Sequence, residues 1–219
     1  MKTTVITPTI GTQRLKDAII SVQEQSVRCK HLIVVDGWQY EKAVRNILID
    51  TEYYGDIIVL PENTGGEWNG HRWNGHRIYA GIPAIVNTDY ISFLDEDNWY
   101  EPGFVETMED EMNGNDIFGA TCRRNIYSQK DEFIGVDNFE SIGKTEFGYY
   151  LYDMNTYFFD TMAYNSLLSE QFYRPLGADK FASEFIIKST FKHNHIETPL
   201  VNYRAPERLT EFFKLNCTK

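Results

Sequence analysis

Four short apolar runs alternate with helix-like segments over the first 100 residues, and this alternation limits the possible folds more than any other feature. The runs are TVIT, LIVVD, IIVL and YISFL, at 4–7, 32–36, 57–60 and 90–94. Between them, apolar residues recur at helical spacing over 12–25, 42–49 and about 76–87. Strands joined through helices run parallel in one sheet, so the sequence predicts an α/β fold with a mostly parallel sheet flanked by helices.

The second half of the chain has a looser pattern. Two aromatic-rich stretches, IFGATC and NTYFFDTMAY, stand between polar loops, and a helical pattern returns at about 178–190. We interpret these as added strands and a smaller, irregular lobe. The length of 219 residues suits one domain, 1–219, with 1–114 and 115–219 as its two halves.

The charge balance restricts the partners. There are 21 Lys and Arg residues against 32 Asp and Glu, a net charge of −11, which argues against nucleic-acid binding. A phosphate-bearing ligand would therefore need a cation or a local cluster of basic side chains. No apolar run is long enough for a transmembrane segment, and no signal peptide is recognisable, so we expect a cytoplasmic protein with reduced cysteines.

Polar side chains follow the predicted strands at their carboxyl ends, where open parallel sheets bind ligands. They are Thr7, Thr9, Asp36, Asn63, Asp95 and Asp97. We expect them to line one crevice. Asp36 could accept hydrogen bonds from a uracil-like base or a ribose, or it could only begin the Asp-Gly turn.

Asp95-Glu96-Asp97 is the sharpest local signal. Asp95 and Asp97 are two residues apart at the end of a buried strand, and a hard divalent cation shared with phosphate oxygens would relieve their repulsion. The alternative is a solvated acidic turn before a helix that starts near Pro102.

The segment from Asn63 to Arg72 combines glycines with the densest positive charge in the chain, and the pentapeptide WNGHR occurs twice in tandem, ending at Arg72 and Arg77. Glycines let the backbone approach a ligand closely, and arginine pairs well with phosphate. One of the two arginines is sufficient for this role. The alternative is a glycine-rich loop with ordinary surface arginines.

These motifs together resemble the family-2-like glycosyltransferases of the GT-A fold, which include small stand-alone viral and bacterial enzymes. The resemblance covers most of the chain and is carried by VITPTIGT, LIVVDGW, the N-x-G…N-G-x-R region and YISFLDEDNWYEPG. It implies a Rossmann-like GT-A fold. Gly177-Ala178-Asp179-Lys180 occupies the place of the family's catalytic helix, although Ala178 replaces the usual acid.

The resemblance also implies roles for individual residues. Asp179 would be the catalytic base, Asp97 with Asp95 would hold Mn²⁺ or Mg²⁺, and His193 or His195 could add a metal ligand. Contacts to the nucleotide-sugar would come from Thr7, Pro8, Thr9, Asp36, Asn63, Gly66, Arg72, Arg77, Asp95 and Glu96. The acceptor side would include Asp160, Thr161 and Trp99. Glu184 is the second candidate for the base.

The expected activity is therefore an inverting, metal-dependent transfer of a sugar from a nucleotide-sugar, UDP-linked as first choice, to a hydroxyl of a glycan or other acceptor. Two alternatives stay open. A sugar nucleotidyltransferase shares the architecture and the acidic metal ligands, but it usually carries a basic, glycine-rich loop after its first strand. A noncatalytic nucleotide-sugar or glycan binding module would keep the crevice without turnover. The sequence does not indicate the oligomeric state.

Overall fold

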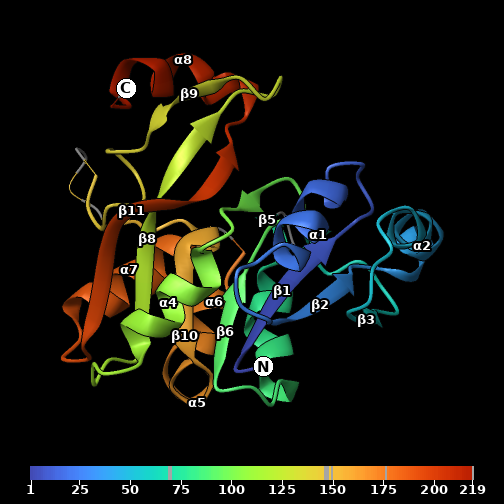
Figure 1. Cartoon of the computed structure of the whole chain (residues 1–219), viewed down its shortest axis with the longest axis horizontal. Coiled ribbons are helices and arrows are strands. Elements are labelled where there is room, and N and C mark those ends of the chain that lie inside the picture. Colours follow the sequence, from blue (N-terminus) through green and yellow to red (C-terminus); the bar gives the residue numbers. More distant parts are fainter. Residues whose placement is uncertain (69–70, 146–147, 149, 176, 219) are drawn as a thin grey trace.

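Four parallel strands form the first half of the central sheet, as the sequence predicted (Figure 1). They are β1 (Thr3–Thr9), β2 (Lys30–Val35), β3 (Asp56–Val59) and β6 (Tyr90–Phe93). This computed structural model describes residues 1–68, 71–145, 148, 150–175 and 177–218. Within these residues the sheet has nine strands, with β9 paired to β8 beside the order β3-β2-β1-β6-β10-β8-β11-β7.

The second half of the sheet is mixed, so the prediction of a mostly parallel sheet is only partly correct. Its strands are β7 (Trp99–Tyr100), β8 (Gly119–Tyr127), β9 (Phe133–Val136), β10 (Tyr157–Asp160) and β11 (His193–Arg204). β10 lies antiparallel between β6 and β8. The reason is the connection: β8 is joined to β10 through β9 and loops, without the crossover helix that a parallel return requires.

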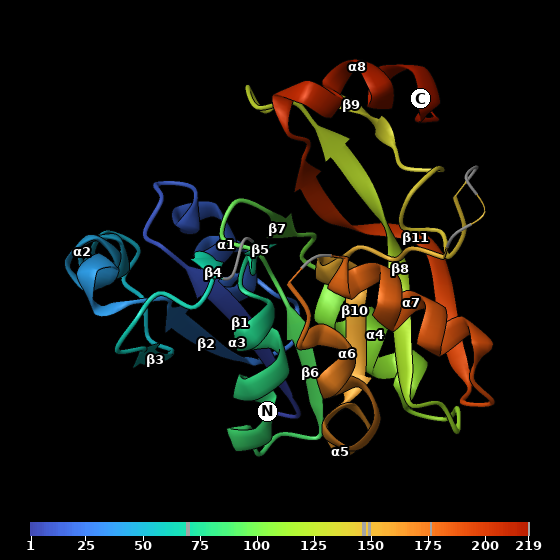
Figure 2. The ribbon, with the colours of Figure 1, turned by 180° about the vertical axis from the view of Figure 1, so that it is seen from behind.

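Helices cover both faces of the sheet (Figures 1 and 2). On one face lie α1 (Leu15–Gln23), α2 (Glu41–Asp50) and α4 (Phe104–Met112). On the other face lie α3 (His76–Gly81), α6 (Ser169–Phe172) and α7 (Ala178–Lys188). The short helical turns are η1 (Trp38–Tyr40), η2 (Ile82–Ile85), η3 (Met154–Thr156), α5 (Thr161–Ala163) and the π-helical η4 (Tyr164–Leu168).

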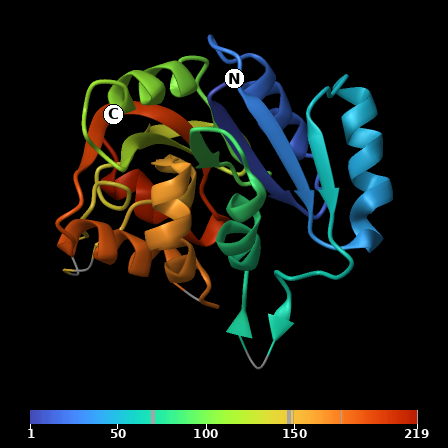
Figure 3. The same cartoon turned by 90° about the horizontal axis from the view of Figure 1, so that it is seen from below.

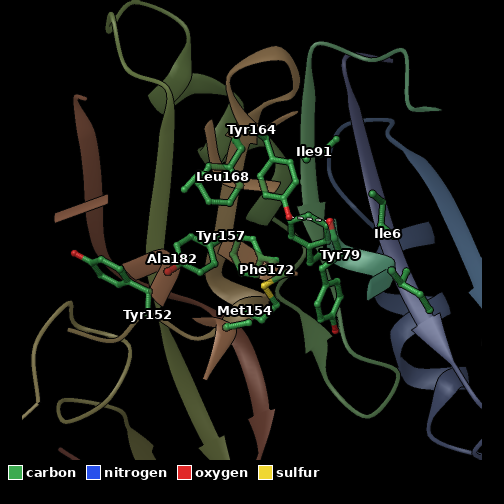
Figure 4. Packing of buried hydrophobic residues seen from close by; sticks show 14 of the residues in the cluster. Ile6, Tyr79, Ile91, Tyr152, Met154, Tyr157, Tyr164, Leu168, Phe172 and Ala182 are labelled. Carbon is green, nitrogen blue, oxygen red and sulfur yellow. Dashed lines mark hydrogen bonds between the residues drawn. The ribbon is translucent and has the colours of Figure 1, made fainter. Parts of the chain in front are cut away.

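The alternation of side chains along β1 explains the two layers. Val5 packs with α1 and α4, whereas Ile6 points to the opposite face and packs with α3 and α7. On that second face the core is rich in aromatic residues, and the hydroxyl of Tyr164 donates a 2.8 Å hydrogen bond to the carbonyl of Tyr79 (Figure 4). Tyr157, Phe158 and Phe159 of the stretch NTYFFDTMAY are all core residues.

The tandem WNGHR repeat folds in two different ways. The first copy contributes to a hairpin of β4 (Glu67–Trp68) and β5 (His71–Arg72), which projects from the body of the protein (Figure 3). The second copy places Trp73 in the interior, has positive φ angles at Asn74 and Gly75, and leads into α3. Equal sequence thus gives unequal backbone structure: the described part of the first copy lies in β4 and β5, whereas the second copy begins at the buried Trp73 and continues into α3.

Helix α8 (Glu207–Asn216) and β9 cover the distal ends of β8 and β11 (Figure 1). Ile126, Ala205 and Phe213 form a small separate core there. Among the described helices, none combines the length and the apolar character needed to cross a membrane.

Candidate functional site

A crevice of about 900 Å³ opens at the carboxyl ends of β1, β2 and β6, where the sequence predicted a ligand site. Seventeen of the described residues line it: Pro8, Ile10, Thr12, Gln13, Arg14, Asp36, Tyr40, Asn63, Gly65, Gly66, Glu67, Asn74, Gly75, Tyr79, Asp95, Glu96 and Asp97. The structure therefore brings together the predicted residues Pro8, Asp36, Asn63, Gly66 and the Asp95–Asp97 motif.

Asp36 organises one end of the crevice. Its carboxylate accepts hydrogen bonds from the Thr64 backbone N–H at 2.6 Å, the Thr64 hydroxyl at 2.8 Å and the Gly65 N–H at 2.8 Å. The side chain of Asn63 donates to the Asp36 carbonyl at 3.0 Å. Asp36 thus fixes the 63–66 loop against the end of β2, and one of its four lone-pair positions is left for a ligand.

Thr7 does not reach the crevice. It is fully buried, and its hydroxyl lies 2.9 Å from Nε2 of His31. Along β1 it shares with Val5 the face that α1 covers, so the expectation that it contacts a nucleoside is corrected. Thr9 is also buried, whereas Pro8 lines the crevice.

Glu96 shapes the wall of the crevice through the turn after β1. Its carboxylate accepts from the Thr9 hydroxyl at 2.6 Å and from the backbone N–H groups of Ile10 and Thr12 at 3.3 and 3.0 Å. Both oxygens of the Glu96 carboxylate thus accept hydrogen bonds from the turn. Glu96 therefore lines the crevice as a structural anchor of the turn.

Asp95 is held by two side chains. Its carboxylate accepts hydrogen bonds from the Tyr79 hydroxyl and, at 2.9 Å, from Nδ2 of Asn155. Burial raises the pKa of Asp95 to about 7, and the charge of Asp97 adds to this shift, while the two hydrogen bonds oppose it.

Asp97 is the carboxylate of the motif that remains available. It is half-buried, and no other side chain of the described residues donates to its carboxylate. Burial and Glu96 raise its pKa, while Arg14 and Arg204 lower it. Nη1 of Arg204 donates a 2.6 Å hydrogen bond to the Asp97 carbonyl, which fixes the backbone of the motif.

Among the described residues that line the crevice, the basic one is Arg14, which was not among the residues predicted from the sequence. Its guanidinium donates to the Gln129 carbonyl at 2.7 Å and lies 3.8 Å from the Asp131 carboxylate. Arg77 is not among the described lining residues, and its guanidinium stacks on the Trp73 ring at 4.1 Å. For Arg72 only the backbone, in β5, belongs to the described structure.

Asp179 lies in the first turn of α7 and is half-buried. Burial raises its pKa to about 6, and the nearby Asp153 carboxylate contributes in the same direction. Asp153 shares the Asn155 amide with Asp95, while Asp179 is not among the described residues that line the crevice. Glu184, the second candidate for the base, pairs with Lys188 and lines a different surface groove.

The expected acceptor-side residues are not at the crevice. Asp160 pairs with Tyr90, at the opposite end of the sheet from Asp95, and accepts a 2.8 Å hydrogen bond from the Ala163 N–H as the cap of α5. Thr161 begins that helix. Trp99 lines a separate hollow of about 450 Å³ and has the Arg204 guanidinium 4.4 Å from its ring.

His193 and His195 also lie away from Asp97. They begin β11, opposite Gly119 and Thr121, whereas Arg204 at the other end of that strand contacts the Asp97 backbone. Both imidazole rings are 5.3 Å from the Tyr152 ring. Burial lowers the pKa of His193 to about 3, so this side chain is neutral at physiological pH.

The described residues contain no group of three or more His, Cys, Asp or Glu side chains that could hold a metal ion by themselves. Magnesium-type sites often use one or two carboxylates and fill the remaining positions with water and substrate phosphates. Asp97, with Asp95 beside it, fits that second kind of site. A cation here would depend on a phosphate-bearing ligand.

No family model and no curated protein matches the sequence. Solved structures do match, among them three forms of S. aureus TarS at 13% identity. The TarS structure matches with a TM-score of 0.62 over 94% of this chain and 37% of that chain. Its 1–349 fragment matches with a TM-score of 0.65 in complex with UDP and 0.66 in complex with UDP-GlcNAc.

These two matches cover 100% and 94% of this chain, and 67% and 59% of the fragment, respectively. This chain therefore spans only part of the proteins it matches. TarS is a GT-A glycosyltransferase, and the likeness extends over nearly the whole chain described above. The mixed sheet, its two helical layers and the crevice at its strand ends together constitute a GT-A (Rossmann-like) fold.

Proposed function

We propose that this protein is a glycosyltransferase that transfers a sugar from a UDP-sugar to an acceptor hydroxyl, with inversion and with the help of a divalent cation. The observation that carries the proposal is the crevice itself. It has Asp36 and its ordered loop at one end and Asp97 with Arg14 at the other, in a fold shared with a protein solved with UDP and UDP-GlcNAc.

The two ends suit the two parts of a nucleoside diphosphate. Asp36, Pro8 and the half-buried Tyr40 offer one carboxylate and apolar surface, which favour a base and ribose. Asp97 and Arg14 favour the diphosphate, Arg14 directly and Asp97 through Mn²⁺ or Mg²⁺. UDP-GlcNAc is accordingly the first donor to test.

Transfer requires a base on the far side of the anomeric carbon from the diphosphate. Asp179 would accept the proton of the acceptor hydroxyl as its oxygen bonds to the anomeric carbon and the bond to the diphosphate breaks, a single displacement that inverts configuration. A bound divalent cation would neutralise charge on the leaving diphosphate. A pKa near 6 leaves Asp179 ionised and basic at neutral pH.

The decisive experiment is incubation of the protein with Mn²⁺ and a panel of UDP-, GDP- and dTDP-sugars, followed by measurement of free nucleoside diphosphate and of glycosylated acceptor. A transferase releases nucleoside diphosphate. A nucleotidyltransferase would instead form a sugar nucleotide and pyrophosphate from a nucleoside triphosphate and a sugar phosphate. A binding module would show affinity by calorimetry without either product, and this outcome would refute the proposal.

A further inference from the structure

Asn155 connects the crevice to the interior of the protein. Its side chain is buried, with 1% of the residue exposed, and all its polar groups are used. Nδ2 donates to Asp95 at 2.9 Å and to Asp153 at 2.8 Å, while Oδ1 accepts from the Asp95 backbone N–H at 2.6 Å. One amide therefore fixes both the side chain and the backbone of the first acid of the motif.

Asn155 is supported by Asp153 and, through it, by the buried Arg124. Asp153 accepts a 2.6 Å hydrogen bond from Nη1 of Arg124, which is itself 1% exposed. Arg124 also donates to Asp137 at 2.7 Å and to Glu140 at 2.9 Å, and its guanidinium lies 4.1 Å from the Tyr203 ring. Three carboxylates and one aromatic ring thus surround the Arg124 guanidinium, and this network restricts the movement of Asp153 and Asn155.

An amide is the side chain that this position requires. Asp95 and Asp153 are two carboxylates that repel each other, and the charge of Asp153 contributes to the raised pKa of Asp95. The two N–H groups of Asn155 satisfy one oxygen of each. Asp at this position would add a third negative charge, and Ala would leave an oxygen of Asp95 without its donor.

We propose that Asn155 is a positioning residue of the donor site, which holds the Asp95 carboxylate in the orientation that nucleoside-diphosphate binding requires. This inference rests on the proposed function, because it takes the crevice as the donor site. Asn155 is not exposed to the crevice and acts only through Asp95. Arg124 and Asp153 keep Asn155 in place.

A double-mutant cycle tests the inference. The affinity for UDP in the presence of Mn²⁺ is measured by calorimetry for wild type, Asn155→Ala, Asp95→Asn and the double variant. Asn155→Ala is expected to weaken UDP binding by about tenfold, the size of one hydrogen bond to a charged group, and to add nothing in the Asp95→Asn background. Asn155→Ser, which retains a donor, replaces Asn155→Ala if the latter does not fold.

Asn202→Ala is the matched control. Asn202 is an equally buried amide, 1% exposed, whose side chain donates to Glu101 at 2.9 Å, away from the crevice. Asn202→Ala should lower thermal stability by about as much as Asn155→Ala does, and it should leave UDP affinity unchanged. Equal affinity losses in the two variants, an undiminished effect of Asn155→Ala in the Asp95→Asn background, or no effect of Asn155→Ala would each overturn the inference. Absence of UDP affinity in the wild type would overturn the proposed donor site as well.

Discussion

Asp179 has an acidity suited to a base that works near neutral pH. Burial raises its pKa to about 6, with Asp153 as the second cause. Only the carboxylate can accept a proton, so kcat for transfer should fall about tenfold per pH unit below pH 6 and level off above it. Rates measured from pH 5 to 8 test this expectation. A flat profile over that range would exclude Asp179 as the base.

The same shift makes Asp179 destabilising at neutral pH. Its pKa rises from 3.8 to about 6 on folding, so folding favours the neutral acid. The ionised side chain therefore lowers the free energy of unfolding. This loss of stability is absent below about pH 4 and complete above about pH 6. Asp179→Asn should therefore raise the free energy of unfolding at pH 8 by about 1–3 kcal/mol, with no gain at pH 4, while transfer falls about 10²–10⁴-fold. Denaturant titrations at both pH values measure the first effect, with Glu184→Gln as the control.

Arg14 is the described basic side chain at the crevice, and it also lowers the pKa of Asp97. Arg14→Ala should weaken UDP binding by about tenfold through loss of a charged contact, and Arg14→Lys should restore part of it. Arg77→Ala serves as the control, because Arg77 stacks on Trp73. A larger loss for Arg77→Ala than for Arg14→Ala in calorimetry would reverse the assignment.

Individual site residues were predictable where a strand end fixed their position. Asp36, Asp95 and Asp97 follow buried strands and do line the crevice. Thr7 was misplaced, because the sequence does not reveal that His31 takes up its hydroxyl. The sequence around Arg14 did not indicate a phosphate-binding residue, since Arg14 reaches the crevice only through the folding of the turn that Glu96 holds.

Among the elements, the 63–66 loop depends most clearly on its glycines. A Cβ at Gly65 would lie 2.8 Å from Oδ2 of Asp36 and 3.1 Å from the Gly75 nitrogen, whereas a Cβ at Gly66 would approach only the Asn63 side chain, at 3.0 Å. Gly65→Ala should displace the loop and weaken UDP binding by about tenfold or more, and Gly66→Ala by about threefold at most. Equal losses in the two variants would contradict the loop geometry.

The elements themselves were predictable to the extent that their connections were local. The strands β1, β2, β3 and β6 and the helices α1, α2 and α7 follow from apolar spacing, and the structure confirms them. The direction of β10 did not follow, because a run such as YFF has the same period whichever way it enters a sheet. That single reversal carried Asp160 to the end of the sheet opposite the crevice.

The whole molecule carries a net charge of −11, and the described crevice contains too few ligands to hold a cation alone. UDP and Mn²⁺ together should therefore raise the melting temperature by more than the sum of their separate effects. UDP at about 100 times its Kd would contribute about 2.7 kcal/mol. Differential scanning calorimetry should show this more-than-additive increase in melting temperature for the wild type and for Asp160→Asn. The increase should become additive in Asp97→Asn. Additive shifts in the wild type would contradict a shared cation.

The position of β11 has a consequence for synthesis on the ribosome. β11 pairs with β8 along one edge and with β7 along the other, and one of its last residues, Arg204, fixes the Asp97 backbone. A nascent chain that has emerged only as far as α7 therefore exposes two unpaired strand edges and lacks this support for the acidic motif. The described residues that line the crevice lie between Pro8 and Asp97, but Arg204 supports the backbone of Asp97. We therefore expect the acidic end of the crevice to become fixed only after residues 193–204 have emerged.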